Sequence, residues 1–256
     1  NANSVTCNEF RDIAGPGIAL ETGIITAPVS YQKVQSVSIT DNLIERVGQD
    51  YYNSSGIVTA YPMTMTVQYN TFRDIPWSAI DLGENSASSA RDQDVSYNDI
   101  YRVCTVLPDC AGIHTFENQP SSDMDENYIH DMTKSAWAAP NWGIHGIYLD
   151  NDSDGWTVND NVIRGIDCPR PNCHTLFVNT TQDACDSDCT LGDNESYDQT
   201  VVDAAGVRST CDNPNPPTPT PTATPPNDPE AQHELTIMAN ADTYLSSVNT
   251  STNYGD

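Results

Sequence analysis

The sequence predicts an all-β solenoid, in which short strands wind into stacked coils, and two repeating patterns support this prediction. A short apolar alternation that ends in Asn and continues into another apolar pair occurs six times, with the Asn residues 34, 28, 28, 29 and 34 positions apart. A second apolar segment follows five of these alternations. Strand-only repeats of this length are typical of solenoids. The period-two alternation, rich in β-branched and aromatic residues, excludes a helical repeat.

The two patterns define the expected elements. The Asn-containing segments span 5–10, 39–44, 67–72, 95–100, 124–129 and 158–163. The second segments, such as GIVT and GIYL, span 17–20, 56–59, 79–82, 112–115 and 146–149. An inward Asn amide at a tight corner can bond the backbone of the turn and the Asn of the next coil, which satisfies polar groups buried there. This structural role is assigned to Asn8, Asn42, Asn70, Asn98, Asn127 and Asn161.

The eight cysteines indicate a secreted, disulfide-bonded protein. Their number is even, and three pairs could each close a small loop: Cys104/Cys110, Cys168/Cys173 and Cys185/Cys189. Disulfides of this kind form in oxidising, extracellular compartments. A zinc site is the weaker alternative, because no C-x2-C pair occurs and the spacers are acidic. The connectivity does not follow from the spacing.

Composition divides the chain into three parts. Residues 1–212 carry the repeats and end in a disulfide-rich C-terminal cap around 165–211. Residues 213–229, NPNPPTPTPTATPPNDP, are a Pro/Thr-rich linker of the kind that separates secreted modules. Residues 230–256 are too few to bury a core of their own, so we interpret them as the beginning of a truncated module.

The charge narrows the choice of partners. Asp and Glu total 36 against 10 Lys and Arg, which gives a formal net charge of −26. Such a chain repels nucleic-acid phosphates and anionic membrane surfaces. No stretch approaches the ~20 apolar residues of a membrane span. We therefore expect no nucleic-acid partner, no membrane insertion and a monomer.

The coil pattern resembles that of the pectate-lyase-like superfamily, the right-handed parallel β-helix proteins, over roughly residues 1–200. The resemblance implies a right-handed parallel β-helix of about six coils, one for each Asn. In that family the Asn ladder lies between the second and third strands of a coil, so the Gly-Ile segment would be the first strand. The outer face of that strand usually forms a saccharide cleft. Members include polysaccharide lyases, glycoside hydrolases, uronan epimerases and noncatalytic surface proteins.

The tail carries a second resemblance. The sequence ADTYLSSVNTSTNYGD, residues 241–256, is similar to the opening of DNRLRE-type carbohydrate-binding modules, in which an A-D-x-Y strand precedes an N-T-N-Y-G turn. Together with the Pro/Thr linker, this resemblance implies a modular protein of polysaccharide breakdown, with a polysaccharide or oligosaccharide as substrate.

Aligning the second segments by their Ile residues predicts one candidate site. If each Ile faces inward, the next residue faces outward, because successive side chains of a strand point to opposite faces. Coils lie about 4.8 Å apart, so ionisable groups on three successive coils fall within reach of one another. These candidate catalytic residues are Asp81, Glu84, His114, Glu117, Tyr148 and Asp150. The alternative is that an exposed face of an acidic protein simply carries polar residues.

Paired carboxylates in this patch favour a secreted glycoside hydrolase. Carboxylates one coil apart, such as Glu84 and Glu117, would be separated by about 5 Å, as in retaining enzymes. Carboxylates two coils apart, such as Asp81 and Asp150, would be separated by about 9.6 Å, near the inverting range.

Two other functions remain open. A polysaccharide lyase or uronan epimerase could use His114 and Tyr148 as base and acid, but it needs a positive group or a metal to neutralise the uronate carboxylate. The aligned strands contain no Lys or Arg, so a polyuronate would be repelled unless Ca²⁺ bridged it. The other alternative is a noncatalytic glycan-binding or surface β-helix protein.

Aromatic residues near the patch suit a sugar. A flat indole offers an apolar platform for a sugar ring, with a polar edge beside it. The candidate substrate-binding residues are Trp77, Trp137, Trp142 and His145. The indoles could instead pack onto their own coils, because Trp is usually well buried.

One acidic loop resembles a cation site. Residues 150–155, DNDSDG, match the first half of a calcium-binding loop, with Asp150, Asp152 and Asp154 as oxygen ligands. The twelfth position is Asn161 rather than Glu, so the match is incomplete, and solvated turn carboxylates are the alternative. The predicted chemistry requires no cofactor, and Ca²⁺ is the metal that the residues suggest.

Overall fold

A computed structural model of the chain describes residues 3–20, 34–83, 90–136, 138–168, 172–186, 188–209 and 211. The predicted linker (213–229) and truncated module (230–256) lie outside these residues. The same holds for two predicted site residues, Glu84 and Trp137.

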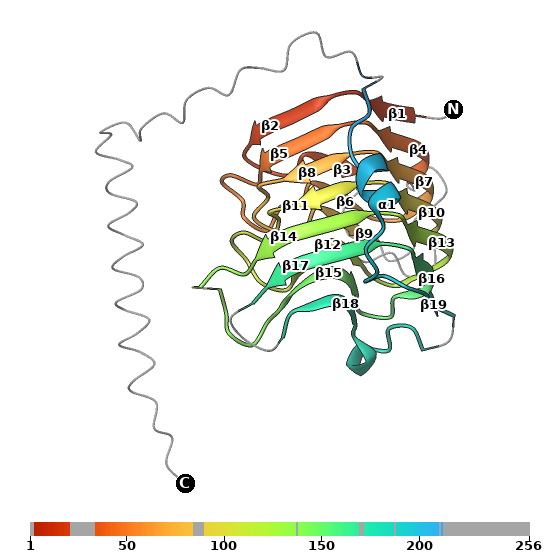
Figure 1. Ribbon diagram of the computed structural model, residues 1–256. Helices are drawn as coiled ribbons and strands as arrows, with labels where there is room; N and C mark the ends of the chain where they lie inside the picture. The colour runs from red at the N-terminus through yellow and green to blue at the C-terminus, as the bar shows by residue number, and fades with distance from the viewer. Residues whose placement is uncertain are drawn as a thin grey trace. The chain divides into compact units, whose positions relative to one another are not determined.

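Three parallel sheets build the fold (Figure 1). Sheet A contains β1 (Asn3–Thr6), β4 (Val34–Thr40), β7 (Pro62–Gln68), β10 (Arg91–Ser96), β13 (Asn118–Asp125), β16 (Asp154–Asn159) and β19 (Thr190–Leu191). Sheet B contains β2 (Glu9–Ile13), β5 (Leu43–Val47), β8 (Thr71–Arg73), β11 (Asp99–Tyr101), β14 (Tyr128–Thr133) and β17 (Val162–Asp167). Sheet C contains β3 (Ile18–Leu20), β6 (Ile57–Thr59), β9 (Ile80–Leu82), β12 (Cys110–Thr115), β15 (Ile144–Leu149) and β18 (His174–Val178).

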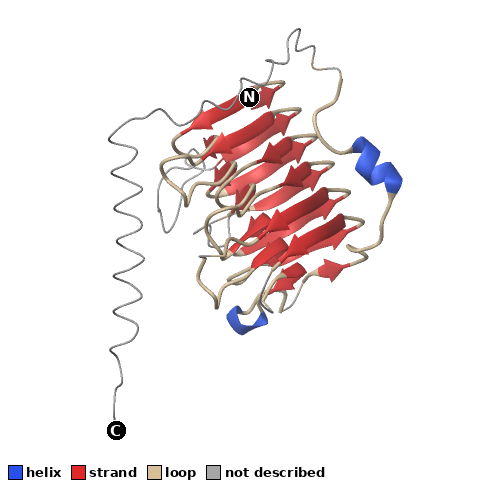
Figure 2. Ribbon diagram, turned by 60° about the vertical axis from the view of Figure 1, so that its left-hand side comes forward, coloured by secondary structure: helices blue, strands red, loops and turns tan. Residues whose placement is uncertain are grey.

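Neighbouring strands in each sheet are three apart in chain order, so each of six coils contributes one strand to each sheet, and β19 adds a further strand to sheet A. Figure 2 shows the resulting stack of strands. This is a parallel β-helix of six coils, which confirms the predicted solenoid. The second segments of the sequence pattern form sheet C.

The core fills the interior of the coils. In sheet C, Ile57, Ile80, Ile113 and Ile147 stand beside one another in register, and each is fully buried. Each such side chain contributes about 1.5–3 kcal/mol through burial. This column fixes which residues of sheet C face outward, because the next residue along each strand points away from the core.

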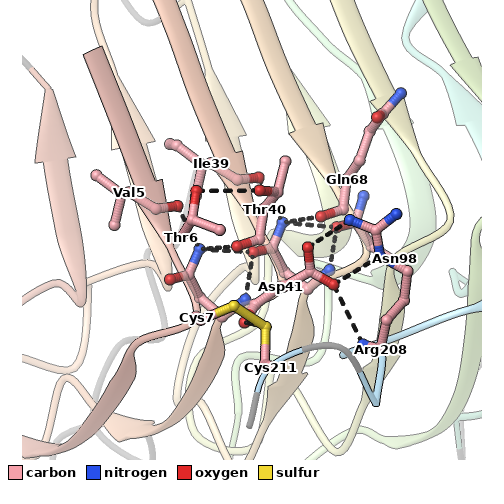
Figure 3. Close-up of polar contacts among 12 residues, drawn as sticks. Val5, Thr6, Cys7, Ile39, Thr40, Asp41, Gln68, Asn98, Arg208 and Cys211 are labelled. Carbon is pink, nitrogen blue, oxygen red and sulfur yellow. Dashed lines mark hydrogen bonds and ion pairs between the residues drawn. A yellow bond between two sulfur atoms is a disulfide. The ribbon is translucent and has the colours of Figure 1, made fainter.

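Stacked Asn side chains hold the corner between sheets A and B (Figure 3). Asn98 Nδ2 donates to Asn127 Oδ1 at 2.9 Å and to Val67 O at 2.8 Å, and Asn98 Oδ1 accepts the Asn70 N–H at 3.0 Å. The residue before each predicted ladder Asn has a φ between 53° and 58°, the left-handed conformation that makes the corner tight. The six predicted residues form this ladder, and Asn194 extends it.

The C-terminal segment runs back along this corner towards the first coil (Figures 1 and 3). After the short helix α1 (Gln199–Ala204), Gly206 N–H donates to Tyr97 O at 2.8 Å. Arg208 Nε donates to Asp41 Oδ1 at 2.8 Å, and Cys211 is bonded to Cys7. We call residues 206–209 and 211 the clasp. They lie beside the first four coils.

Four disulfides are present: Cys7–Cys211, Cys104–Cys110, Cys168–Cys173 and Cys185–Cys189. The last three close the small loops that the sequence suggested. The first joins residues 204 positions apart. Four disulfides indicate folding in an oxidising compartment. No helix among the described residues is long and apolar enough to cross a membrane.

Candidate active site on the outer face of sheet C

The predicted outward column exists, and it continues one coil further than the sequence pattern. Asp81 stands beside His114, and His114 stands beside Tyr148. Phe177 of β18 follows Tyr148 in the same column. The strand β18 reads HTLFV and lacks the Gly-Ile pair of the other second segments, so the repeat did not reveal it.

Aromatic rings cover this face over the last three coils. The rings of His114 and Tyr148 stack with centroids 4.5 Å apart and an interplanar angle of 6°. The ring centroid of Phe177 lies 5.1 Å from that of Tyr148, 4.6 Å from that of His145 and 5.0 Å from that of His174. We call these five residues the aromatic cluster. Rings of this kind offer flat apolar faces with polar edges, which suit a sugar ring.

A pocket of about 350 Å³, here the sheet C pocket, lies against this cluster. The turn before β12 contributes Asp109, the turn before β15 contributes Trp142, and Asn179 follows β18. His145, Tyr148 and Phe177 also line the pocket. Trp142 is 53% exposed, so its indole is free to meet a ligand.

Asp150 is a buried but ionised carboxylate beside the pocket. Asn179 Nδ2 donates to Asp150 Oδ1 at 2.7 Å, and His114 Nε2 lies 3.5 Å from Asp150 Oδ2. Burial alone would raise the pKa of Asp150, but the contact with His114 and the hydrogen bond from Asn179 outweigh it and hold the pKa below its ordinary value. The ionised side chain can therefore act as a base or as a nucleophile.

Asp109 has the opposite environment. Burial raises its pKa above the ordinary value, the charge of Asp150 raises it further, and His114 opposes the shift. Asp109 N–H donates to Gly143 O at 2.7 Å, and the Cys104–Cys110 disulfide closes the turn that carries it. A carboxyl group with a raised pKa stays protonated to higher pH and can donate a proton.

Two neighbouring groups in the pocket stay neutral. Burial lowers the pKa of His145 to about 3, with repulsion from His174 and His114 adding to the effect. Burial and the charge of Asp150 raise the pKa of Tyr148, so its hydroxyl remains protonated. Asn179 Nδ2 lies 3.4 Å from that hydroxyl oxygen. His145 and Tyr148 therefore offer the pocket uncharged hydrogen-bonding groups.

A buried lysine holds the turn that carries Trp142. Lys134 is only 5% exposed, and its Nζ donates to Ala139 O at 2.9 Å and also to Trp142 O. The same turn accepts the Asp109 N–H at Gly143. The turns before β12 and β15 are thus bound to each other at the rim of the sheet C pocket.

The structure brings some predicted site residues together and separates others. Tyr148, Trp142 and His145 line the pocket, whereas His114 stacks on Tyr148 and Asp150 accepts a hydrogen bond from Asn179. Asp81 is buried one coil earlier, where its Oδ2 accepts a hydrogen bond from Ser55 Oγ at 3.2 Å.

Glu117 and Trp77 are not among the described residues that line the pocket. Glu117 N–H donates to Asn151 O at 2.8 Å, and burial together with the charge of Asp152 raises the pKa of its carboxyl group. Trp77 is partly buried and packs against the hydrophobic core. The predicted pairing of Glu84 with Glu117 falls partly outside the described residues.

Two of the three predicted calcium ligands, Asp150 and Asp154, accept hydrogen bonds from groups of the protein. Asp150 Oδ1 accepts from Asn179, and Asp154 Oδ1 accepts the N–H groups of Asp188 at 2.8 Å and Gly155 at 3.1 Å. Within the described ranges, no group of three or more His, Cys, Asp or Glu side chains is placed to hold a metal ion. The calcium loop stays a prediction without a supporting contact.

The pocket residues that the sequence did not predict include Asp109, His174, Phe177 and Asn179. Asp109 lies in the turn before β12, outside the Gly-Ile segments that predict the outward-facing residues. Its position directly before Cys110, in a loop closed by a disulfide, was the available signal. The other three belong to the sixth coil, whose sequence departs from the repeat.

Comparisons with known proteins give a fold and no family. No family model matches the chain, and no curated protein matches it. A solved structure described as "Glycoside hydrolase" matches with a TM-score of 0.67 at 21% identity. The match covers 82% of this chain and 35% of that chain, so this chain spans about a third of the solved protein's length. This likeness establishes a shared fold.

Proposed function

We propose that the protein is a glycoside hydrolase that acts on a neutral glycan in the sheet C pocket. One observation carries the proposal: Asp109 lines an aromatic pocket, Asp150 is hydrogen bonded to Asn179 of the same pocket, and the environments of the two carboxyl groups move their pKa values in opposite directions. Pairs of carboxyl groups that differ in this way divide acid and base roles between them. The likeness to a solved glycoside hydrolase supports the same reaction class.

The roles follow from the two protonation states. Asp109, protonated, donates its proton to the glycosidic oxygen as the bond to the anomeric carbon breaks. Asp150, ionised, either removes a proton from the attacking water or attacks the anomeric carbon itself. Asn179 and His114 orient Asp150 by their contacts with its two oxygens. Trp142 and the aromatic cluster receive sugar rings.

The charge of the pocket favours hydrolysis over the lyase or epimerase alternative. Among the described residues that line the pocket there is no Lys or Arg, and His145 stays neutral. The described lining therefore offers a uronate carboxylate no permanently charged cation to bind. Tyr148, whose pKa is raised, stays protonated and can donate a hydrogen bond to a sugar oxygen.

The first test measures product masses after the protein is incubated with neutral and uronate polysaccharides. We expect water-added fragments from a neutral glycan. Asp109→Asn and Asp150→Asn should each lower kcat/KM by about 100-fold or more, because each removes one partner of acid–base catalysis. Asp203→Asn, an exposed carboxylate on α1, is the matched control and should leave the rate unchanged.

The pH profile separates the two roles. Activity should fall at low pH as Asp150 becomes protonated, below the ordinary range of a carboxyl group. It should fall at high pH as Asp109 loses its proton, above that range. Asp109→Asn should remove the high-pH decline. Unsaturated fragments would point to a lyase, and glycan binding without any product would point to a noncatalytic protein.

A further inference from the structure

A second pocket lies on the turns between sheets B and C, in coils two to four. Its volume is about 420 Å³, and its lining includes Arg46, Gln49, Tyr52, Asp74 and Thr105. We call it the Tyr52 pocket. Tyr52 is 43% exposed, so its ring presents an apolar face to a ligand. The amide, hydroxyl and charged groups around the ring can hydrogen bond to the edge of a sugar.

The charges of the Tyr52 pocket are already compensated. Arg46 Nε donates to Asp12 Oδ1 at 2.7 Å, and Arg46 Nη1 donates to the buried Glu45 at 2.8 Å. Asp74 accepts from Arg102 Nε at 2.7 Å. A ligand therefore meets polar groups that carry no net excess of either sign, which suits a neutral polar molecule. An anion or a cation would have to compete with an existing ion pair.

The floor of the pocket is rigid. Gly48 has a φ of 69°, and a Cβ at this position would lie 2.7 Å from Pro76 Cγ, so the two turns approach as closely as the absence of a side chain allows. Thr105 N–H donates to Ile75 O at 3.2 Å, and Val106 N–H donates to Pro76 O at 3.2 Å. The site is preformed, which lowers the entropy lost on binding.

One disulfide-closed turn belongs to both pockets. Within the Cys104–Cys110 loop, Thr105 and Val106 line the Tyr52 pocket, whereas Asp109 lines the sheet C pocket. Three residues span at most about 11 Å, so Val106 and Asp109 are within the reach of a short oligosaccharide. The turn is bonded on one side to Pro76 and on the other to Gly143.

We propose that the Tyr52 pocket is a distal subsite that binds a neutral sugar unit of the same glycan chain whose bond is cleaved beside Asp109. The proposal rests on the proposed hydrolase function. The glycan crosses the Cys104–Cys110 turn, with one end in each pocket. Long oligosaccharides then bind through both pockets, whereas a disaccharide fills the sheet C pocket alone.

Calorimetric titration with cello- and laminari-oligosaccharides of two and six units tests this proposal. The Asp150→Asn protein prevents turnover, and Tyr52→Ala is placed in that background. We expect Tyr52→Ala to weaken binding of a hexasaccharide by about tenfold, because one aromatic contact is lost, and to leave disaccharide binding unchanged. Tyr51→Ala is the matched control, since Tyr51 is 65% exposed and does not line the pocket.

Kinetics of the protein with Asp109 and Asp150 intact provide an independent measurement. Tyr52→Ala should raise KM for the longer substrate with little change in kcat. Equal hexasaccharide affinity with and without Tyr52, or no binding of either series, overturns the distal subsite. If the protein cleaves the glycan with the same kinetics with and without Tyr52, the distal subsite is refuted and the hydrolase function stands. If hexasaccharide binding depends on Tyr52 but no glycan is cleaved, the hydrolase function is refuted and the subsite stands.

Discussion

Asp109 and Asp150 show how surroundings divide two identical side chains into different chemical species. Burial is the largest influence on both, and it favours the neutral form in each case. The difference lies in the hydrogen-bond donors, because Asp150 has Asn179 and His114 whereas Asp109 has no comparable pair. Strand alignment predicted Asp150, but it could not predict Asp109, since a turn residue has no fixed register.

A second residue-scale feature, the Asn ladder, was predictable because the same amide recurs at the same place in each coil. Asn98 is fully buried in the middle of the ladder and bonds Asn70, Val67, Ser96 and Asn127. Asn98→Ala leaves several of these groups without partners, at about 1–3 kcal/mol each. We expect the free energy of unfolding, measured in urea, to fall by about 3 kcal/mol or more.

Asn8 provides the comparison for this substitution. It lies at the end of the ladder, where it is exposed and bonds a single neighbouring Asn side chain, that of Asn42. Asn8→Ala should therefore cost about 1 kcal/mol. Equal losses for the two variants would show that interior stacking adds nothing to the stability of the corner.

At the scale of elements, the strands were predicted well and the turns were not. The Ile column fixed the register of sheet C, because inward and outward residues must alternate once one face is buried. The turns before β12 and β15 differ in length and sequence and share no pattern. Their shape depends on single contacts, such as Lys134 with Ala139 and Trp142.

Lys134 is a positioning residue for the turn before β15. Lys134→Met removes the donor for two carbonyl groups of that turn, so Trp142 should lose its fixed place. We expect KM to rise by about tenfold with kcat largely unchanged, and near-ultraviolet circular dichroism to report a changed indole environment.

Trp142→Ala is the matched variant for this prediction. It should raise KM to a similar extent, and the double variant should be no worse than either single variant, because both act through one contact. Additive effects would instead mean that Lys134 supports binding by another route.

At the scale of the whole molecule, the clasp joins the two ends of the solenoid. The spacing of the cysteines gave no signal for the Cys7–Cys211 disulfide, because these two residues are 204 positions apart. Closing a loop of this size stabilises the folded state by about 5 kcal/mol in the chain-entropy account, whereas a loop as short as that of Cys185–Cys189 gives about 2 kcal/mol.

Replacing each pair by serines tests this difference. The variant without Cys7 and Cys211 should lose more free energy of unfolding in urea than the variant without Cys185 and Cys189. The reverse order would show that the short loop, which lies beside Asp154, matters more than the joining of the ends.

The clasp also imposes an order of events on biogenesis. Six cysteines find partners four to six residues away, so their rings can close while the chain is still emerging. The thiol of Cys7 can meet its partner only after Cys211 has been synthesised and has returned along the corner. Oxidation of this last pair therefore marks completion of the solenoid. A molecule stalled part-way through winding would be recognisable by one unreacted thiol near its start.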